Sequence, residues 1–354
     1  MSKREFWDQV RQECAEVVAR NPLAALDELR GECLLITGGT GFMGTWLAEL
    51  VAYLNDDHAF NTSLILLSDQ AHEFAARAPH LARRPDITLV EQDIRGVVEL
   101  PAAINWIIHA AGSPDNRLHA SDPLRTIHVI AHGTDGLLAA AARLPNLKQI
   151  LNISSGLVYG SQPLEVEAIA EDYRGMSECN AITAAYAEAK RMGETLCAAY
   201  RSQHRLLIVN ARPFAFIGPY QLLDRPWAIN NFIRDSILGG PIRILGDGET
   251  VRSYMYPSDM AWWLLNILLH GTSGLSYNVG SPHAVTLNQL ADRITRHFRE
   301  PIRVVSRVAG GAHLRRTRFV PDVSLAQRTL GLSCQVDLDT ALQRTIEWHQ
   351  RVTA

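Results

Sequence analysis

Cysteine is scarce in this chain, and its few cysteines are far apart. The 354 residues include five: Cys14, Cys33, Cys179, Cys197 and Cys334. No two of them form a Cys-x-x-Cys pair, and their odd number does not suit a fully paired disulfide framework. His128 and His132 are four residues apart in a predicted helix, but no third ligand accompanies them. We therefore expect neither a disulfide scaffold nor a metal site.

Long apolar runs and an excess of one charge are also missing. No apolar stretch approaches the ~20 residues needed to span a bilayer. Residues 1–18 carry charges throughout and lack the continuous apolar segment of a signal peptide. The 34 Lys and Arg residues nearly balance the 37 Asp and Glu residues, which does not point to nucleic acid or an anionic membrane as a partner. We expect a soluble, cytoplasmic protein.

Short apolar runs alternate with helical segments from about residue 32 onward. Runs such as CLLI and SLILLS are typical of buried parallel strands. This order predicts an α/β fold: a Rossmann-type doubly wound parallel sheet with a smaller α/β substrate-binding lobe near the C-terminus. Residues 4–20 have helical spacing, and we expect this helix to pack on the main domain rather than to bind a partner. The expected units are an N-terminal helical extension at 1–30, a dinucleotide-binding domain at 31–215 plus about 251–280, and the lobe at 216–250 and 281–354.

A glycine-rich loop, TGGTGFMG, follows the first predicted strand and opens a helix. Gly38, Gly41 and Gly44 would let the backbone approach a pyrophosphate, which the amides at a helix N-terminus stabilise. The spacing differs from Gly-x-Gly-x-x-Gly, so the loop by itself is also compatible with a structural turn.

Asp69 ends the next predicted strand, where an acidic residue binds the adenosine ribose in this fold. A carboxylate there favours NAD, because it repels the additional phosphate of NADP. The alternatives are an ordinary strand-end aspartate and a key position occupied by Ser68 instead. We expect NAD as the cofactor, and NADP remains the alternative.

Tyr186 and Lys190 are four apart in AAYAEAK and so project from one face of a predicted helix. A free tyrosine is a poor base at neutral pH, but a nearby ammonium and the positive charge of an oxidised nicotinamide would both lower its pKa. Ser154 and Ser155 follow a predicted strand in NISSGLVYG, where a hydroxyl is placed to orient a substrate oxygen. Each pattern alone is also compatible with ordinary helix surface and with serines that bond to the backbone.

Together these segments resemble the extended short-chain dehydrogenase/reductase family, which includes nucleotide-sugar epimerases and dehydratases. The resemblance runs from about residue 32 to residue 350. Its motifs occur in the family's order: TGGTGFMG, EQDIR, HAAG, SSGLVYG, YAEAK, ARPFAFIGP, GDGETVRSYMYPSDMA, YNVGS and PDVSLAQRTLGL. The resemblance implies the predicted fold, NAD as cofactor, a nucleotide-diphosphate sugar as substrate, and a homodimer built on the helices around 123–144 and 184–200.

The resemblance also implies roles for individual residues. Ser155, Tyr186 and Lys190 match the catalytic triad, and the distance from Val-Tyr-Gly selects Ser155 over Ser154. The expected cofactor-binding residues are Gly38, Gly41, Phe42, Met43, Gly44, Asp69, Asp93, Ile94, Ala110, Ala111, Gly112, Tyr186, Lys190 and Pro213. For the substrate, Ser155 would contact the sugar, and Arg252 matches the arginine that holds the diphosphate. Asn231 lies downstream of the ARPFAFIGP segment, where we expect it to line the sugar pocket.

The residues after Ser155 distinguish among the reactions of this family. The sugar dehydratases have Asp-Glu immediately before Val-Tyr-Gly and the related decarboxylases have a glutamate, whereas this chain has Gly156 and Leu157, neither of which can transfer a proton. We therefore expect an NAD-dependent nucleotide-sugar epimerase that acts at C4 through a transient keto-sugar, with Tyr186 as acid and base. Ala215 replaces a substrate-contacting asparagine of many relatives, so the sugar pocket differs from theirs. The alternatives are a keto-sugar reductase or dehydrogenase, a dehydratase, and a non-catalytic dinucleotide-binding sensor.

Overall fold

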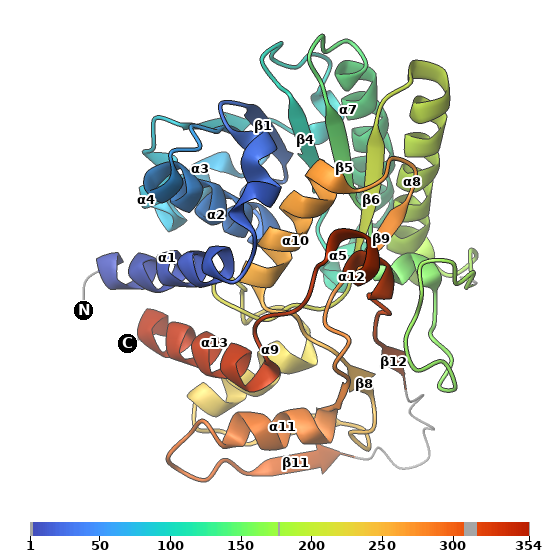
Figure 1. Ribbon diagram of the computed structural model, residues 1–354. Coiled ribbons are helices and arrows are strands. Elements are labelled where there is room, and N and C mark those ends of the chain that lie inside the picture. Colours follow the sequence, from blue (N-terminus) through green and yellow to red (C-terminus); the bar gives the residue numbers. More distant parts are fainter. Residues whose placement is uncertain (1–2, 176–177, 308–316, 354) are drawn as a thin grey trace.

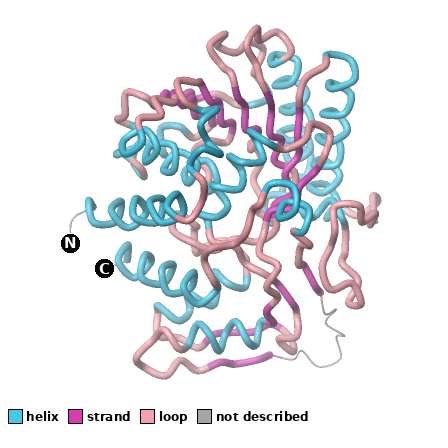
Figure 2. The backbone as a smooth tube through the Cα atoms, in the orientation of Figure 1, coloured by secondary structure: helices cyan, strands magenta, loops and turns pink. Residues whose placement is uncertain are grey.

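Seven parallel strands form the central sheet of the protein (Figure 1, Figure 2). The computed structural model describes residues 3–175, 178–307 and 317–353. The strand order is β3-β2-β1-β4-β5-β6-β9. The strand bounds are β1 Cys33–Thr37, β2 Ser63–Ser68, β3 Ile87–Glu91, β4 Trp106–His109, β5 Gln149–Ile153, β6 Ile208–Pro213 and β9 Ser276–Val279. The predicted doubly wound parallel sheet is confirmed, with the order reversing between β1 and β4.

Helices cover both faces of this sheet, which explains why its strands are apolar throughout. Leu34 and Ile36 of β1 belong to the larger core cluster, together with α2 (Phe42–His58) and α10 (Pro257–His270). Leu35 belongs to the second cluster, which contains residues of α7 (Gly133–Ala141) and α8 (Ala185–His204). Successive side chains of the strand therefore stabilise opposite layers.

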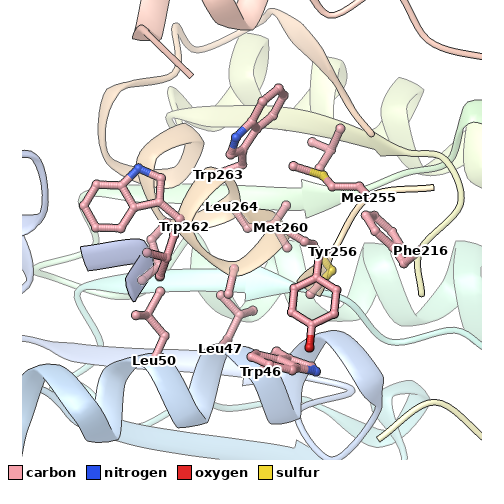
Figure 3. Close-up of a cluster of buried hydrophobic side chains, with 14 of the residues drawn as sticks. Trp46, Leu47, Leu50, Phe216, Met255, Tyr256, Met260, Trp262, Trp263 and Leu264 are labelled. Atoms are coloured by element: carbon pink, nitrogen blue, oxygen red, sulfur yellow. The ribbon is translucent and has the colours of Figure 1, made fainter. Parts of the chain in front are cut away.

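Several large aromatic side chains lie on α2 and on or immediately before α10. Trp262 and Trp263 are buried. Figure 3 shows these two residues on α10, and it places Trp46 of α2 beside Tyr256, which immediately precedes α10. The rings of Trp46 and Tyr256 meet edge to face with 6.1 Å between their centroids.

The N-terminal helix α1 (Lys3–Ala19) packs on the main domain, as expected. Val10, Cys14 and Val17 are buried in the larger core cluster. The C-terminal helix α13 (Leu338–Thr353) runs beside α1, so the two ends of the described chain are close together (Figure 1). An ion pair of 2.6 Å between Glu16 and Arg344 connects the two helices.

Smaller sheets and helices form the part of the chain that follows β6. Their strands make a three-stranded sheet, β10-β8-β12, and a two-stranded sheet, β11-β7. The strand bounds are β7 Ile242–Leu245, β8 Val251–Arg252, β10 Val285–Thr286, β11 Val304–Arg307 and β12 Arg318–Phe319. The helices are α9 Ala228–Ile237, α11 Leu287–Thr295 and α12 Ser324–Leu330. The short strands and the helices α9 and α12 carry too little periodicity to be predicted one by one from the sequence.

The remaining helices are short and lie mainly around the carboxyl ends of the strands. Their bounds are η1 Leu23–Leu29, α3 Ala71–Arg77, α4 Pro79–Ala82, η2 Ile94–Gly96, α5 Asn116–Ser121, α6 Pro123–Ile127, η3 His128–His132, η4 Gly156–Tyr159 and η5 Ile182–Ala184. Within the described ranges, every helix is too short or too polar to cross a bilayer.

Candidate active site

The carboxyl ends of the parallel strands bring the predicted site residues to one edge of the sheet. In doubly wound folds, ligands bind at this edge, where the strand order reverses. The residues that follow or end these strands are Gly38 after β1, Asp69 after β2, Asp93 after β3, Ala110 after β4, Ser155 after β5 and Pro213 in β6. Residues distant in sequence thus share one edge because the strands are parallel and in register.

The glycine loop has the geometry of a pyrophosphate cradle. Gly38 has φ +65°, and a Cβ atom there would lie 2.7 Å from the carbonyl oxygen of Ala110. A Cβ on Gly44 would overlap the backbone of Gly39. Gly41 precedes α2, and no side chain among the described residues caps the first turn of that helix. The amides of Phe42 and Met43 are therefore available to an anion, and the loop fits the pyrophosphate of NAD.

Asp69 follows β2, at the same edge of the sheet as the glycine loop. The side chain is about half exposed, and its closest cation is Arg125 at 3.8 Å. Ser68 does not compete for this role, because its buried hydroxyl accepts hydrogen bonds from the Thr40 hydroxyl at 2.7 Å and from the Gln70 amide at 3.2 Å. The Asp69 carboxylate therefore remains the group placed to meet a ribose, and that role is still a prediction.

Asp93 and Ile94 occupy the neighbouring strand end. The guanidinium of Arg95 hydrogen bonds to Asp93 and holds the pKa of that carboxyl below its usual value. Ile94 is buried, and a Cβ on Gly133 of α7 would lie 2.7 Å from its side chain. This pair thus offers one polar and one apolar surface beside the adenosine end of the cradle.

The segment after β4 approaches both the glycine loop and α8. Gly112 has φ +132°, and a Cβ at this position would lie 3.1 Å from Ile130 and 3.7 Å from the Nζ of Lys190. The Ala111 amide donates to the Thr37 hydroxyl, which lies 2.7 Å from Nδ1 of His109. A glycine is required at residue 112, since this backbone conformation is strained for other residues.

Ser155, Tyr186 and Lys190 meet at the carboxyl end of β5. The side chain of Ser155 hydrogen bonds to the Tyr186 hydroxyl, and it also accepts from the Leu157 amide at 3.1 Å. Lys190 Nζ lies 5.9 Å from the centre of the Tyr186 ring. Ser154 does not join them, and its buried hydroxyl lacks a hydrogen-bond partner in the described part of the chain. The structure therefore brings the three predicted catalytic residues together and selects Ser155 over Ser154.

The acidity of Tyr186 differs from the sequence prediction. Burial raises the pKa of Tyr186 to about 12, and the hydrogen bond with Ser155 opposes this shift. Burial also lowers the pKa of Lys190 to about 8. The loss of water therefore favours the neutral form of both the tyrosine and the lysine. The prediction of a lowered tyrosine pKa is therefore wrong for the protein alone, because the lysine does not compensate for the loss of water around the phenol.

The loop after Ser155 has little room for another catalytic side chain. A Cβ on Gly156 would lie 2.8 Å from Cζ of Phe319 and 2.9 Å from Cε2 of Phe214. These two aromatic rings stack on each other with 4.4 Å between their centroids. Leu157 follows with an apolar side chain that is 45% exposed. Neither position after Ser155 can supply or accept a proton.

The predicted substrate residues come from the lobe that follows β6. Arg252 pairs in register with Phe319 in the three-stranded sheet, and its guanidinium donates to the Thr317 hydroxyl at 2.9 Å. Burial lowers the pKa of Arg252, but a guanidinium stays protonated. Asn231 lies on α9, where its side-chain oxygen accepts from Arg234 at 2.9 Å. Their proposed contacts with substrate remain predictions.

Sequence reasoning misses two features beside Tyr186. The ring of His119 on α5 stacks on the Tyr186 ring. Asp115, just before α5, forms ion pairs with Arg117 at 2.7 Å and with Arg225 at 2.6 Å. No motif marks these residues, because α5 is a single short helix and Arg225 is distant in sequence.

Proteins named UDP-glucuronic acid decarboxylase are similar to this chain over most of its length. The chain is 27% identical over 340 residues to UDP-glucuronic acid decarboxylase 1 of Danio rerio, covering 93% of this chain and 75% of the relative. It is 28% identical over 314 residues to UDP-glucuronic acid decarboxylase 6 of Arabidopsis thaliana, covering 87% of this chain and 86% of the relative.

Solved structures share the fold. One is a UDP-glucuronic acid 4-epimerase from Bacillus cereus in complex with UDP-glucuronic acid and NAD, with a TM-score of 0.77, 21% identity, and coverage of 90% of this chain and 99% of that one. Another is a dTDP-glucose 4,6-dehydratase from Streptomyces venezuelae with NAD bound, with a TM-score of 0.75, 22% identity, and coverage of 90% and 97%.

The family assignment rests on more than half of the chain. A sequence model of the NAD dependent epimerase/dehydratase family matches residues 34–280, which include the glycine loop, Ser155, Tyr186 and Lys190. The family uses NAD, and the cradle after β1 fits that cofactor. This chain belongs to the NAD-dependent epimerase/dehydratase family of enzymes.

Proposed function

We propose that this enzyme is a nucleotide-sugar epimerase that inverts C4 through a transient keto-sugar. The observation that carries the proposal is the neighbourhood of Ser155. The triad for sugar oxidation is assembled, while Gly156 and Leu157 leave the following loop without a second acid or base. An epimerase needs no such group, because its keto-sugar intermediate rotates in the pocket and takes the hydride back on its other face.

Tyr186 and Ser155 have different roles at the sugar hydroxyl. In its phenolate form, Tyr186 accepts the proton of the sugar hydroxyl at its oxygen, and it returns that proton to the sugar oxygen at the end of the cycle. Ser155 hydrogen bonds to that phenol and orients the same sugar oxygen. When bound, oxidised NAD supplies a hydride acceptor and a positive charge. That positive charge would oppose the burial that holds the Tyr186 pKa at about 12.

The substrate class follows from the phosphate-binding features and the relatives. Three of the similar proteins described above are named for UDP-glucuronic acid and one for dTDP-glucose. A guanidinium such as that of Arg252 suits diphosphate oxygens because of its planar fork. We propose a nucleotide-diphosphate sugar as the substrate and UDP-glucuronic acid as the first candidate.

Decarboxylation is the second candidate, because the similar proteins from Danio rerio and Arabidopsis thaliana are named UDP-glucuronic acid decarboxylases. A C4 ketone beside a C5 carboxylate forms a β-keto acid, which loses carbon dioxide without an acid catalyst. The carbanion that remains needs a proton donor at C5, and the loop after Ser155 offers none.

Product analysis separates these reactions. The purified enzyme is mixed with catalytic NAD and a panel of UDP- and dTDP-sugars that includes UDP-glucuronic acid, and products are examined by mass spectrometry and NMR. An unchanged mass with an inverted C4 supports the proposal. Loss of carbon dioxide or of water would replace it with decarboxylation or dehydration, and stoichiometric consumption of the nicotinamide would indicate a reductase or dehydrogenase.

A further inference from the structure

A histidine from outside the catalytic triad lies flat on the catalytic tyrosine. The centroids of the His119 and Tyr186 rings are 4.3 Å apart, and their planes differ by 13°. Both side chains are buried, with 8% and 7% of their surfaces exposed. His119 belongs to α5, whereas Tyr186 belongs to α8, so the stack joins two separate elements at the reacting end of the site.

His119 is itself held in one orientation. Its Nε2 lies 2.7 Å from the carbonyl oxygen of Ser113. A carbonyl only accepts, so Nε2 carries the proton and Nδ1 is unprotonated in the neutral ring. Asp115 caps the N-terminus of α5 and pairs with Arg225 from the segment before α9. The plane of the imidazole is therefore defined by bonds that do not involve Tyr186.

We propose that His119 is a positioning residue for Tyr186: its ring is a rigid plate that fixes the plane of the phenol, so that the hydroxyl stays directed at Ser155 and the sugar. This inference rests on the acid–base role of Tyr186 in the proposed function. Tyr186 shares a small apolar cluster with Ile130 and Ala189, and Ile127 packs against that cluster. Without His119, one face of the phenol would lose its support.

The His119 ring positions Tyr186 through its shape and not through its charge. The charged groups that face His119 are Lys190 on α8 and Asp115 before α5, and their effects on its charge oppose each other. Arg125 of the adjacent α6 has its ion pair with Asp69 instead. Burial is the largest effect and lowers the pKa of His119, which favours the neutral ring.

Three substitutions separate shape from hydrogen bonding. His119→Phe keeps a flat ring and removes the bond to Ser113, while His119→Gln keeps an amide donor and removes the ring. His119→Ala removes both. We expect kcat to fall about 10-fold in the Ala and Gln variants, with KM and the NAD dissociation constant within about twofold of the unsubstituted enzyme, because misplaced catalytic groups lower the rate of the chemical step. We expect His119→Phe to keep kcat within about threefold.

Thermal unfolding of each variant distinguishes a displaced tyrosine from a protein that has lost its fold. The exposed His128→Ala serves as the matched control and should leave kcat unchanged. A normal kcat in His119→Ala, or a loss in His119→Phe as large as in His119→Ala, would overturn the inference. If His119→Ala does not fold, the comparison of His119→Gln with His119→Phe decides the same question.

A spectroscopic measurement tests the orientation and protonation of the His119 ring without measuring enzyme activity. In the cofactor-free protein at pH 7, ¹⁵N NMR should show His119 as a neutral ring protonated at Nε2, identified by its loss in His119→Gln. A doubly protonated ring would contradict the inference. The proposed function has its own test: normal kcat in the Tyr186→Phe variant would contradict it. Full activity in His119→Ala together with an inactive Tyr186→Phe would remove only the role of His119.

Discussion

The Nζ of Lys190 donates a hydrogen bond of 2.7 Å to the carbonyl oxygen of Ile153, the last residue of β5. Ser155 follows two residues later, so this bond fixes the helix that carries Tyr186 relative to the strand that carries its partner. Lys190 is 6% exposed, and burial lowers its pKa to about 8. The ammonium of Lys190 is therefore costly to bury. It nevertheless lies at the centre of the site.

Lys190→Met should remove this connection and the only cation close to the Tyr186 ring among the described residues. We expect kcat to fall at least about 100-fold, since acid–base groups contribute on this scale. Steady-state kinetics with the substrate found by product analysis provides the measurement. Lys148→Met is the control, because Lys148 is largely exposed and pairs with Glu32. Equal activity of the two variants would contradict the role of Lys190.

Tyr186→Phe should abolish turnover while leaving NAD binding intact, because only the phenol oxygen is removed from a ring that stays buried. We expect a loss of at least about 100-fold in kcat, and a dissociation constant for NAD within about threefold by calorimetry. Tyr200→Phe is a matched control on the same helix, where the Tyr200 hydroxyl hydrogen bonds to Asp135 at 2.9 Å. A sensor without catalysis would show no difference among the three proteins.

Gly156→Ala should destabilise the protein, because the added methyl would contact the rings of Phe319 and Phe214. Overpacking of this kind costs about 1–3 kcal/mol. Urea unfolding provides the free energies, and in a Phe319→Ala background the same substitution should cost less, because the truncated side chain leaves space for the methyl group. If the two substitutions change the free energy of unfolding additively, the contact between residue 156 and Phe319 is not the cause of the destabilisation.

Asp69→Ala should weaken the preference for NAD over NADP, because it removes the carboxylate that would meet the ribose and repel the additional phosphate of NADP. We expect NAD affinity to fall about 10-fold and the ratio of NADP to NAD affinity to rise, both measured by calorimetry. Glu73→Gln on α3 removes a nearby negative charge and is the control. An unchanged cofactor ratio would assign the selectivity to another residue.

The stability of the protein should decline from acidic to mildly alkaline pH because of Glu13. Its carboxylate is buried between Gln9 and Tyr256, at 3.0 and 2.8 Å, and burial raises its pKa to about 7. An unfolded glutamate titrates near about 4.3. The stabilising contribution of the protonated form is therefore fully present below that value and is lost as the pH rises through 7.

Glu13→Gln should remove this dependence. Between pH 5 and pH 8, its free energy of unfolding should decline less than that of the unsubstituted protein, by on the order of 2 kcal/mol. Urea unfolding at the two pH values gives the comparison, with Glu16→Gln as a control on the same helix. Parallel curves for the unsubstituted protein and Glu13→Gln would show that Glu13 is ionised in both states.

The linear pattern of residues predicts the sheet, and the resemblance to a known family, which the motifs carry, predicts the triad. Apolar runs of strand length predict buried parallel strands, and the glycine loop after the first of them predicts the cradle that the backbone of Gly38 forms with Ala110. Tyr186 and Lys190 follow from helical spacing, since residues four apart share a face. These features depend on neighbours in sequence, where local stereochemistry decides the outcome.

The acidity of Tyr186 and the surroundings of Gly156 depended instead on contacts between distant residues. The sequence places Lys190 one turn from Tyr186, but only the packed structure shows that burial outweighs it and raises the tyrosine pKa. The sequence shows a glycine at residue 156, but the ring of Phe319, from a different sheet, explains why a side chain would not fit there. Desolvation and steric exclusion are properties of the folded interior and have no local pattern.

The sequence by itself determined the fold class, the cofactor loop and the three residues that are predicted to be catalytic. Only the tertiary structure decided what surrounds them: His119 stacked on Tyr186, and Arg225 paired with Asp115 at the start of α5. The physical reason is that strands, helices and glycine turns follow from short-range backbone preferences. The environment of a catalytic group is made by side chains that meet only when the chain has folded.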